Sequence, residues 1–460
     1  MSTTPKLLKP EEQVLSTLRN DGSRRWLKPR LSHGWFLIFR RLVAYLLIAA
    51  FTVVPYIKFE GKPLILLDVA HREFTIFGYT FLPTDTILLA LLLVSTILGV
   101  FLLTALFGRL WCGWACPQTV YMEFVFRPIE RLFEGTGGRG GKPKRQVAGW
   151  RQVLRFVIYL LVSMYLAHTF LAYFVGVDNL RQWVQQSPLE HPTSFLIMMS
   201  VTALMMFDFC FFREQLCIIA CPYGRLQSVM LDKFSLIVSY DEKRGDPRGP
   251  VRKKTGGDCV DCGQCVSTCP TGIDIRKGLQ MECIGCAQCI DVCNKVMTKV
   301  GRAKGLIRYS SQHTMAGNKR RLIRPRVLIY PLLLAVVFGI FLNLLMNKDS
   351  ADVTILRNFG APFTVASDEI VDNNMRLRIT NRSEEDAAYM IRVLNGDTEL
   401  EFVIRENPIK IAAGKNLTEG VLIHVPRTAF KDGILDVLID VNDGKAFQKQ
   451  VPCRLLGPAD

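Results

Sequence analysis

The chain has 460 residues, enough for two to four structural modules. Hydrophobic residues make up 49% of it, yet 57 Lys and Arg residues outnumber 41 Asp and Glu residues, which gives a net charge of +16. The apolar content excludes a disordered chain, and the charge excludes an acidic soluble enzyme. Such a combination indicates that apolar residues and cations are segregated along the chain.

Five apolar segments have the length of membrane-spanning helices, which need about 20 mostly apolar residues. We predict spans at 42–57, 86–107, 156–177, 194–212 and 327–346. The first has only 16 residues, so a helix on the membrane surface or in a soluble core is the alternative there. The arginine pair directly N-terminal to it can extend to the interface.

Lys and Arg residues gather on alternate sides of these spans. Segments 1–35, 109–150 and 213–326 contain 7, 7 and 21 of them, whereas loops 58–85 and 178–193 contain 3 and 1. Because basic flanks stay in the cytoplasm, we expect the N-terminus inside and the C-terminus outside. The basic N-terminus then indicates topology or anionic lipid, not nucleic acid, and no cleavable signal peptide precedes the first span.

Residues 347–460 differ from the rest, because 18 Asp and Glu residues outnumber 14 Lys and Arg residues. Apolar and polar residues alternate in short runs such as 375–380 and 435–441, separated by turn signals such as Asn442-Asp-Gly. This pattern is typical of an immunoglobulin-like β-sandwich. Its single cysteine, Cys453, leaves no internal disulfide, and docking or shielding is the expected role.

Eight cysteines form two copies of one motif. Residues 259–270 and 283–294 both contain C-x2-C-x2-C-x3-C, followed by proline in the first copy and by Asn294 in the second. This spacing is the bacterial ferredoxin pattern, in which the fourth cysteine of each run ligates the other [4Fe–4S] cluster. We therefore predict one cluster on Cys259, Cys262, Cys265 and Cys293, and a second on Cys283, Cys286, Cys289 and Cys269.

Zinc and disulfide bonds are the alternatives for these eight cysteines. Tetrahedral zinc takes four ligands per site and does not require two repeats of this spacing. Disulfides are disfavoured because the charge distribution puts the module in the reducing cytoplasm. The predicted cofactors are therefore two [4Fe–4S] clusters in a ferredoxin-like module.

Four further cysteines form two C-x3-C-P motifs, each beside the end of a predicted span. Cysteines at i and i+4 share one face of a helix, while proline disfavours helical geometry at the preceding residue. Two such pairs could bring four sulfurs together as a soft site for Cu(I), zinc or an iron–sulfur centre. Buried packing and a redox-active dithiol are the alternatives. The residues are Cys112, Cys116, Cys217 and Cys221.

Polar residues inside the predicted spans are further candidates, because they are costly in hydrocarbon. Asp208 is a functional candidate, with an ion pair to Arg213 as the alternative. Cys210 is a weaker candidate ligand, since a buried cysteine is commonly packing. A methionine–histidine copper site, again with packing as the alternative, would use Met164, His168, Met205 and Met206.

These motifs together resemble one family, the cytochrome c oxidase accessory proteins, also called FixG, RdxA or CcoG. The resemblance rests on the two C-x3-C-P motifs, the tandem ferredoxin runs and the late span before a β-sandwich, and it covers essentially the whole chain. It implies a multi-pass protein of the bacterial inner (cytoplasmic) membrane. The expected parts are a cytoplasmic basic segment (1–35), a four-helix membrane domain (36–240), a cytoplasmic dicluster ferredoxin module (241–325), a fifth transmembrane helix (326–346) and a periplasmic immunoglobulin-like domain (347–460).

The function that the resemblance implies is electron transfer that reduces Cu(II) to Cu(I) for oxidase assembly. Copper would be handled by Cys112, Cys116, Cys217 and Cys221, and the clusters would carry electrons from an unknown cytoplasmic donor. Oxidase subunits or copper chaperones are the expected partners, together with membrane lipid. The alternatives are a quinol-linked electron-transfer subunit, which is not expected to carry the outer sandwich, and a non-enzymatic assembly scaffold.

Overall fold

The structure is a computed structural model, which describes residues 17, 24, 26–59, 61–70, 72–81, 85–134, 149–251, 256–319, 324–358, 361–366, 369–383, 385–396, 398–445 and 447–458. Much of the expected basic segment 1–35 and most of the Gly-rich linker 134–150 lie outside the described residues, as do four residues of the linker 241–258. The chain divides into two compact units, Met1–Ile340 and Phe341–Asp460.

Within the described residues, five helices are long and apolar enough to cross a membrane, as predicted. The first and third begin earlier than the predicted apolar runs do, at Trp35 and Gly149. The helices are α1 (Trp35–Val53, extended by η2, Val54–Tyr56), α2 (Thr86–Phe107), α6 (Gly149–Val175), α8 (Pro192–Phe207, extended by the π-helical η4, Asp208–Phe212) and α14 (Pro325–Met346).

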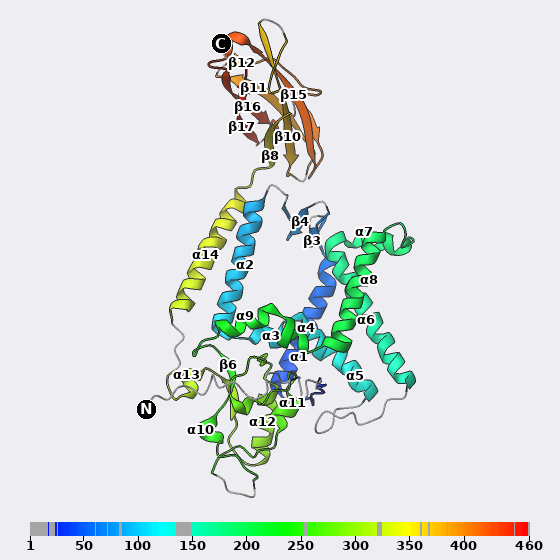
Figure 1. The fold of residues 1–460 in the computed structure, drawn as a ribbon, viewed down its shortest axis with the longest axis vertical. Helices are drawn as coiled ribbons and strands as arrows, with labels where there is room; N and C mark the ends of the chain where they lie inside the picture. The colour runs from blue at the N-terminus through cyan, green and yellow to red at the C-terminus, as the bar shows by residue number, and fades with distance from the viewer. Residues whose placement is uncertain are drawn as a thin grey trace. The chain divides into compact units, whose positions relative to one another are not determined.

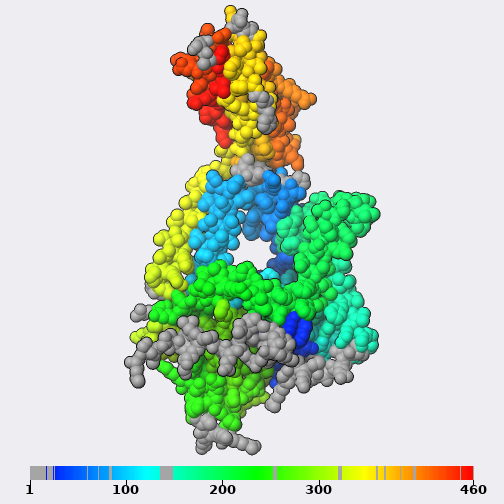
Figure 2. All heavy atoms as spheres, viewed as in Figure 1, coloured from blue at the N-terminus to red at the C-terminus, as the bar shows by residue number. Residues whose placement is uncertain are grey.

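The membrane helices of the first unit form two groups. Helix α6 packs along α8, and the Tyr173 hydroxyl of α6 donates a hydrogen bond of 2.8 Å to the Phe51 carbonyl of α1. Helix α2 instead contacts α14 through Phe101 and Tyr330, with ring centroids 6.4 Å apart. Figure 2 shows an opening between α2 and the group of α1, α6 and α8.

The loop between α1 and α2 contains small antiparallel sheets that the sequence analysis treated as plain loop. Strands β1 (Lys58–Phe59) and β2 (Lys62–Pro63) pair, and β3 (Ile65–Asp68), β4 (Glu73–Ile76) and β5 (Tyr79–Phe81) form a three-stranded sheet. The strands are too short for a periodic signal. Helix α7 (Val177–Gln185) lies in the loop that precedes α8.

Short helices form a layer at one end of the membrane helices. They are α3 (Leu110–Trp114), α4 (Pro117–Tyr121), the π-helical η3 (Met122–Phe126), α5 (Arg127–Glu134), the π-helical η5 (Leu216–Ala220) and α9 (Pro222–Met230). Figure 1 shows α3, α4 and α9 lying between the long helices and the module with the eight ferredoxin-type cysteines.

That module is built on two paired strands and short helices. Strand β6 (Ile237–Tyr240), which precedes the expected boundary at residue 241, pairs antiparallel with β7 (Ile307–Ser310). The helices are α10 (Glu242–Gly245), α11 (Gln264–Thr268), η6 (Ile275–Lys277), α12 (Gln288–Lys299) and α13 (Gln312–Met315). Its core is apolar and includes Val238, Ile273, Ile275, Ile290, Met297, Leu306 and Ile307.

The module is anchored to the first membrane helix by a carboxylate. Asp291 of α12 accepts hydrogen bonds from the backbone N–H groups of Phe36 (3.2 Å) and Leu37 (2.9 Å) at the start of α1. These amides have no partner within their own helix, and a carboxylate at a helix N-terminus is also favoured by the helix dipole. The Phe36 ring contacts Tyr309 of β7, with centroids 5.6 Å apart.

The second unit is the predicted β-sandwich. One sheet has the order β13-β15-β10-β8, with β9 on β10, and the other has the order β12-β11-β16-β17, with β14 on β11. The strands are β8 (Ala351–Arg357), β9 (Thr364–Val365), β10 (Ile370–Asn381), β11 (Ala387–Asn395), β12 (Thr398–Glu399), β13 (Phe402–Val403), β14 (Ile409–Ile411), β15 (Asn416–Pro426), β16 (Ile434–Asn442) and β17 (Gln448–Leu456).

Alternating residues of both sheets fill the sandwich core, and Cys453 is one of them. Asn381 is fully buried there: its Nδ2 donates to the Ile411 carbonyl (3.1 Å) and its Oδ1 accepts from the Tyr389 hydroxyl (3.2 Å). A buried amide with partners on both atoms joins β10 to the opposite sheet without a desolvation penalty.

A matched pair of leucines tests the sandwich core. Leu377 is 1% exposed and Leu356, on the neighbouring strand, is 42% exposed. We expect Leu377→Ala to lower the free energy of unfolding by about 2–5 kcal/mol, because it leaves a cavity. Leu356→Ala should cost less than about 1 kcal/mol. Urea unfolding of residues 347–460 followed by circular dichroism measures both, and equal losses would contradict the assigned register.

Candidate metal centres

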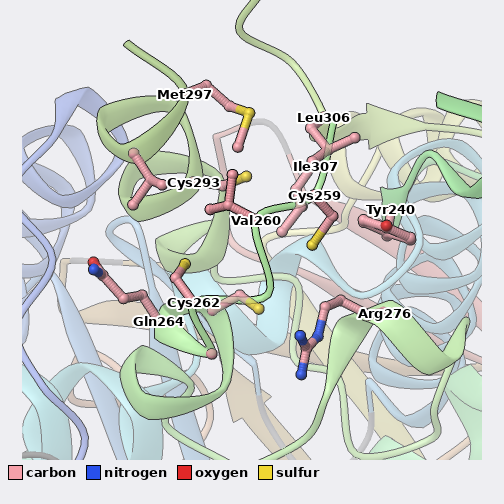
Figure 3. Close-up of a pocket in the computed structure, with 13 residues that line it drawn as sticks. Tyr240, Cys259, Val260, Cys262, Gln264, Arg276, Cys293, Met297, Leu306 and Ile307 are labelled. Carbon is pink, nitrogen blue, oxygen red and sulfur yellow. The ribbon is translucent and has the colours of Figure 1, made fainter. Parts of the chain in front are cut away.

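Four cysteines from the two runs line one cavity of about 360 Å³: Cys259, Cys262, Cys265 and Cys293. The first three lie at and just before α11, and Cys293 lies in the second turn of α12. Figure 3 shows Cys259, Cys262 and Cys293 around this space, with apolar Met297 and Leu306 behind them and Arg276 at its edge. The fourth cysteine of the second run thus joins the first three of the other run.

The second cavity has a similar volume, about 340 Å³, and contains the complementary set of cysteines. Its remaining walls are apolar apart from Thr271, whose hydroxyl lies 3.4 Å from the Cys269 sulfur. The crossed pairing that the spacing predicts is therefore the one that the structure brings together. The four cysteines are Cys269, Cys283, Cys286 and Cys289.

The chemistry of both cavities fits an iron–sulfur cluster. Among the described residues, no three His, Cys, Asp or Glu side chains lie close enough to hold a single metal ion, whereas a cubane cluster separates its four thiolates around a larger body. Burial raises the pKa of Cys265 to about 12 and that of Cys283 and Cys293 to about 11. Such thiols ionise at neutral pH only when a metal centre compensates their charge.

The two cavities differ in their access to solvent. Cys262 of the first cavity is exposed, whereas the other thirteen cysteines, all within the described residues, are buried or half-buried. In the second cavity Cys286 is buried, and Cys269, Cys283 and Cys289 are half-buried. The first cavity is therefore the one that a soluble partner can approach.

The two C-x3-C-P motifs share one local geometry that differs from the expected helix face. Cys112 lies in α3 and Cys217 in η5, but Cys116 and Cys221 have extended backbones (ψ of 126° and 108°) and precede new helices. The following proline occupies the first position of that new helix, which suits its fixed φ. The interpretation of each pair as i, i+4 on one helix is wrong, because the proline constraint dominates.

The four thiols nevertheless form one group. Every pair among Cys112, Cys116, Cys217 and Cys221 lies within electrostatic range. Burial raises the pKa of Cys112 and Cys116, and it raises the pKa of Cys217 to about 12. The group is therefore a set of soft sulfur donors on the membrane side of the cluster module, and we refer to it as the thiol site.

Gln227 of α9 positions the thiol site, and the sequence analysis missed it. The Cys112 thiol donates a hydrogen bond of 2.9 Å to its Oε1, while its Nε2 donates to the Tyr223 hydroxyl (2.6 Å) and to Thr104 Oγ1 (3.3 Å). The one available sequence signal was the i, i+4 spacing of Tyr223 and Gln227 directly after Cys221. That signal is weak without the fold.

The thiol site is in direct contact with the second cavity. Cys112 packs against Ile284 and Cys286, and a Cβ on Gly113 would lie 2.5 Å from the Ile284 carbonyl oxygen. Only glycine permits this approach. The Trp114 indole N–H donates to the Tyr309 hydroxyl (3.1 Å), which in turn donates to the carbonyl of Gly285 (2.5 Å).

Buried ion pairs surround this contact. The Arg213 guanidinium donates to both oxygens of Glu130, at 3.1 and 2.8 Å, and Arg127 contacts Glu123 and Glu214. The alternative in which Arg213 pairs with Asp208 is therefore wrong, because Glu130 takes the guanidinium. A cavity lined by Cys217, Arg127 and Glu214 reaches Pro270 and Thr271 of the cluster module.

Of the candidate side chains in the membrane spans, several pack in the protein core, and the Asp208 carboxylate has no evident structural role. Met205, Met206 and Cys210 pack against the core around Phe126. His168 Nδ1 lies 2.8 Å from the carbonyl oxygen of Met164, one turn earlier in the same helix. For Asp208, Oδ1 is buried and accepts no hydrogen bond from the described residues. The packing interpretation therefore explains the methionines and Cys210.

Paired substitutions test the crossed ligand sets. Cys259→Ser/Cys293→Ser removes two ligands from one cavity, so about half of the iron and one cluster signal should remain. Cys259→Ser/Cys269→Ser removes one ligand from each cavity and should disturb both clusters. Iron and sulfide analysis with electron paramagnetic resonance measures both, with Cys453→Ser as the control. The reverse ranking of the two double variants would show that each run binds its own cluster.

Gly113→Ala tests the contact between the thiol site and the second cavity. The added methyl group must displace the Ile284–Cys286 loop, at a cost of about 1–3 kcal/mol, so Cys112 should react faster with a maleimide reagent. Mass spectrometry of the native protein measures this labelling. Gly99→Ala is the matched control, since a Cβ there meets nothing within 4 Å. Labelling of Cys112 at the parental rate in Gly113→Ala would refute the contact.

Comparisons with known proteins agree with this architecture. Residues 89–135 match a family model described as a 4Fe-4S binding domain, residues 212–312 match a 4Fe-4S dicluster domain, and residues 341–458 match an IG-like fold at the C-terminal of FixG. The first of these matches includes the motif with Cys112 and Cys116, and the second includes all ten cysteines from Cys217 to Cys293.

Curated relatives extend the match to most of the chain. The chain is 34% identical to Protein RdxA of Cereibacter sphaeroides over 384 residues, which cover 79% of this chain and 81% of the relative. It is 32% identical to Protein RdxB of the same organism, over 86% and 88% of the two chains. It is 31% identical to Nitrogen fixation protein FixG of Rhizobium meliloti, over 79% and 78%. The chain therefore belongs to the FixG/RdxA family of membrane iron–sulfur electron-transfer proteins.

Proposed function

We propose that this protein reduces Cu(II) to Cu(I) at the thiol site and so provides Cu(I) for the assembly of cytochrome c oxidase. The observation that carries the proposal is the contact between Cys112 and Cys286, which places a group of soft donors against an electron-carrying centre. Thiolates favour Cu(I) over harder ions. One-electron reduction of copper bound at the thiol site is therefore favourable, and the electron has only a short distance to travel.

The order of the centres follows from burial. The two clusters, when bound in their cavities, supply electrons one at a time. Cys262 is the exposed edge of the first cavity, so we propose that a soluble donor docks there. A cluster held by Cys269, Cys283, Cys286 and Cys289 would supply one-electron chemistry beside Cys112, across the close packing at Gly113. The donor itself is unidentified.

The thiol-site residues bind the substrate copper ion and exclude water. Two thiolates are enough to hold Cu(I), and four allow transfer from one pair to the other. Because burial raises the pKa of Cys112, Cys116 and Cys217, copper binding must release protons. Gln227 Oε1 accepts a hydrogen bond from the Cys112 thiol. This contact keeps the sulfur in place before copper binds.

We also propose that the N-terminus, the cluster module and the thiol site face the bacterial cytoplasm and that the sandwich faces the periplasm. The support is the excess of Lys and Arg in segments 1–35, 109–150 and 213–326. The sandwich would then dock an oxidase subunit or a copper chaperone.

Replacement of the four thiols tests the copper proposal. We expect Cys112→Ser/Cys116→Ser/Cys217→Ser/Cys221→Ser protein to retain its iron but to reduce Cu(II) at the rate of the protein-free background. The measurement is anaerobic mixing of reduced protein with Cu(II) and a Cu(I)-specific chelator. Cys210→Ser/Cys453→Ser is the control and should keep the parental rate. Parental activity of the fourfold variant would exclude the thiol site.

A quinol-linked electron transfer is the second candidate function, favoured by the opening between α2 and the group of α1, α6 and α8. In a membrane this space is filled by lipid, and a lipid-soluble carrier could approach the short-helix layer through it. Reduction of the clusters by a quinol analogue in nanodiscs without copper would support this function. Copper-dependent oxidation of the clusters, with no response to quinol, would support the first.

A further inference from the structure

Arg40 is a buried cation that forms no ion pair within the part of the chain that the structure describes. It lies in α1 and is 0% exposed, and its Nε donates a hydrogen bond of 2.8 Å to the Gly113 carbonyl. Both Nη atoms are buried and have no hydrogen-bond partner among the described residues. A guanidinium placed this way is costly unless another charge compensates it.

The neighbouring polar groups compensate this charge only in part, since none of them forms an ion pair with Arg40 among the described residues. The Asp291 oxygens accept the backbone N–H groups of Phe36 and Leu37, and the Tyr309 hydroxyl donates to Gly285. The Phe124 ring centroid lies 5.4 Å from the guanidinium carbon and offers a cation–π contact. The buried carboxylates of the short-helix layer are engaged by Arg127 and Arg213.

The second cavity lies next to Arg40. Cys286 lines the second cavity, and Gly113, which accepts from Arg40, is packed against the backbone of Cys286. A [4Fe–4S] cluster held by four thiolates is an anion, and it becomes more negative when it is reduced. The missing counter-charge is therefore what the second cavity provides when loaded.

The first cavity is also lined by an arginine, but that arginine forms ion pairs with carboxylates. Arg276 lines it, but its guanidinium contacts Asp274 at 2.7 Å and also contacts Asp261. Because those carboxylates neutralise it and Asp261 is exposed, its field at the first cavity is weak. The two cavities thus differ in local charge, which is one of the factors that set a cluster's reduction potential.

We infer that Arg40 is the counter-cation of the second cluster and raises its reduction potential above that of the first. Electrons would then move spontaneously from the exposed first cavity to the second, next to the membrane. Arg40 acts as a positioning and tuning residue. The inference requires clusters in both cavities and is independent of whether copper or another acceptor receives the electron.

The test is a redox titration of the full-length, iron-loaded protein in nanodiscs, monitored by electron paramagnetic resonance. In Arg40→Gln we expect one midpoint potential to fall and the other to stay. Arg41→Gln is the matched control, because Arg41 is the next residue and is exposed; both potentials should remain parental. Unchanged potentials in Arg40→Gln, or equal shifts of both, would overturn the inference.

Cluster assignment comes from single-cluster backgrounds. In Cys259→Ser/Cys293→Ser protein, which should retain the second cluster, Arg40→Gln should lower the remaining potential. In Cys269→Ser/Cys283→Ser protein, which should retain the first, it should have no effect. The opposite pattern would assign Arg40 to the other cluster and refute the inference.

A second substitution protects the test against loss of the cluster. Arg40→Lys keeps a cation but has a shorter side chain and fewer N–H donors. We therefore expect the midpoint potential to fall less than in Arg40→Gln, and the iron content to stay parental. If Arg40→Gln protein does not retain iron, Arg40→Lys decides the matter, and a parental potential in it would count against the inference. Copper reduction is not needed for any of these readouts.

Discussion

The close approach of Gly113 to the Ile284–Cys286 loop is the contact on which the electron-transfer arrangement depends. It leaves no space for a side chain between the thiol site and the second cavity, and it places the first C-x3-C-P motif against the loop that contains Cys286. The extended backbone that Pro117 imposes on Cys116 turns the chain immediately afterwards, so the layer of short helices can lie across the membrane helices. Membrane domain and cluster module therefore form one compact unit.

Buried arginines lie around this contact, and they fall into two classes by whether a carboxylate pairs with them. Arg127 and Arg213 are neutralised by glutamates within the protein, which fixes the short-helix layer but creates no net field. Arg40 forms no ion pair among the described residues, and we infer that its charge acts on the second cavity. The ion pairs of Arg127 and Arg213 thus stabilise the short-helix layer, whereas the proposed role of Arg40 is to tune the reduction potential of the second cluster.

Signals that are local in sequence predicted most of the architecture. The five spans follow from apolar length, the crossed cysteine sets follow from the fixed spacing of the ferredoxin runs, and the sandwich follows from alternation and turns. Features that depend on residues far apart were missed or mistaken: Arg213 selects Glu130 over Asp208 because tertiary packing places the glutamate there. Gln227 and Arg40 carry no motif, and their roles arise only from what the fold places beside them.

The exposure of Cys262 has a consequence for the life of the protein in air. The edge that would admit a soluble electron donor would also admit oxygen and peroxide, so we expect oxidative damage to begin at Cys262, the exposed cysteine of the first cavity. Damage there would cut the supply of electrons before it reached the buried Cys112.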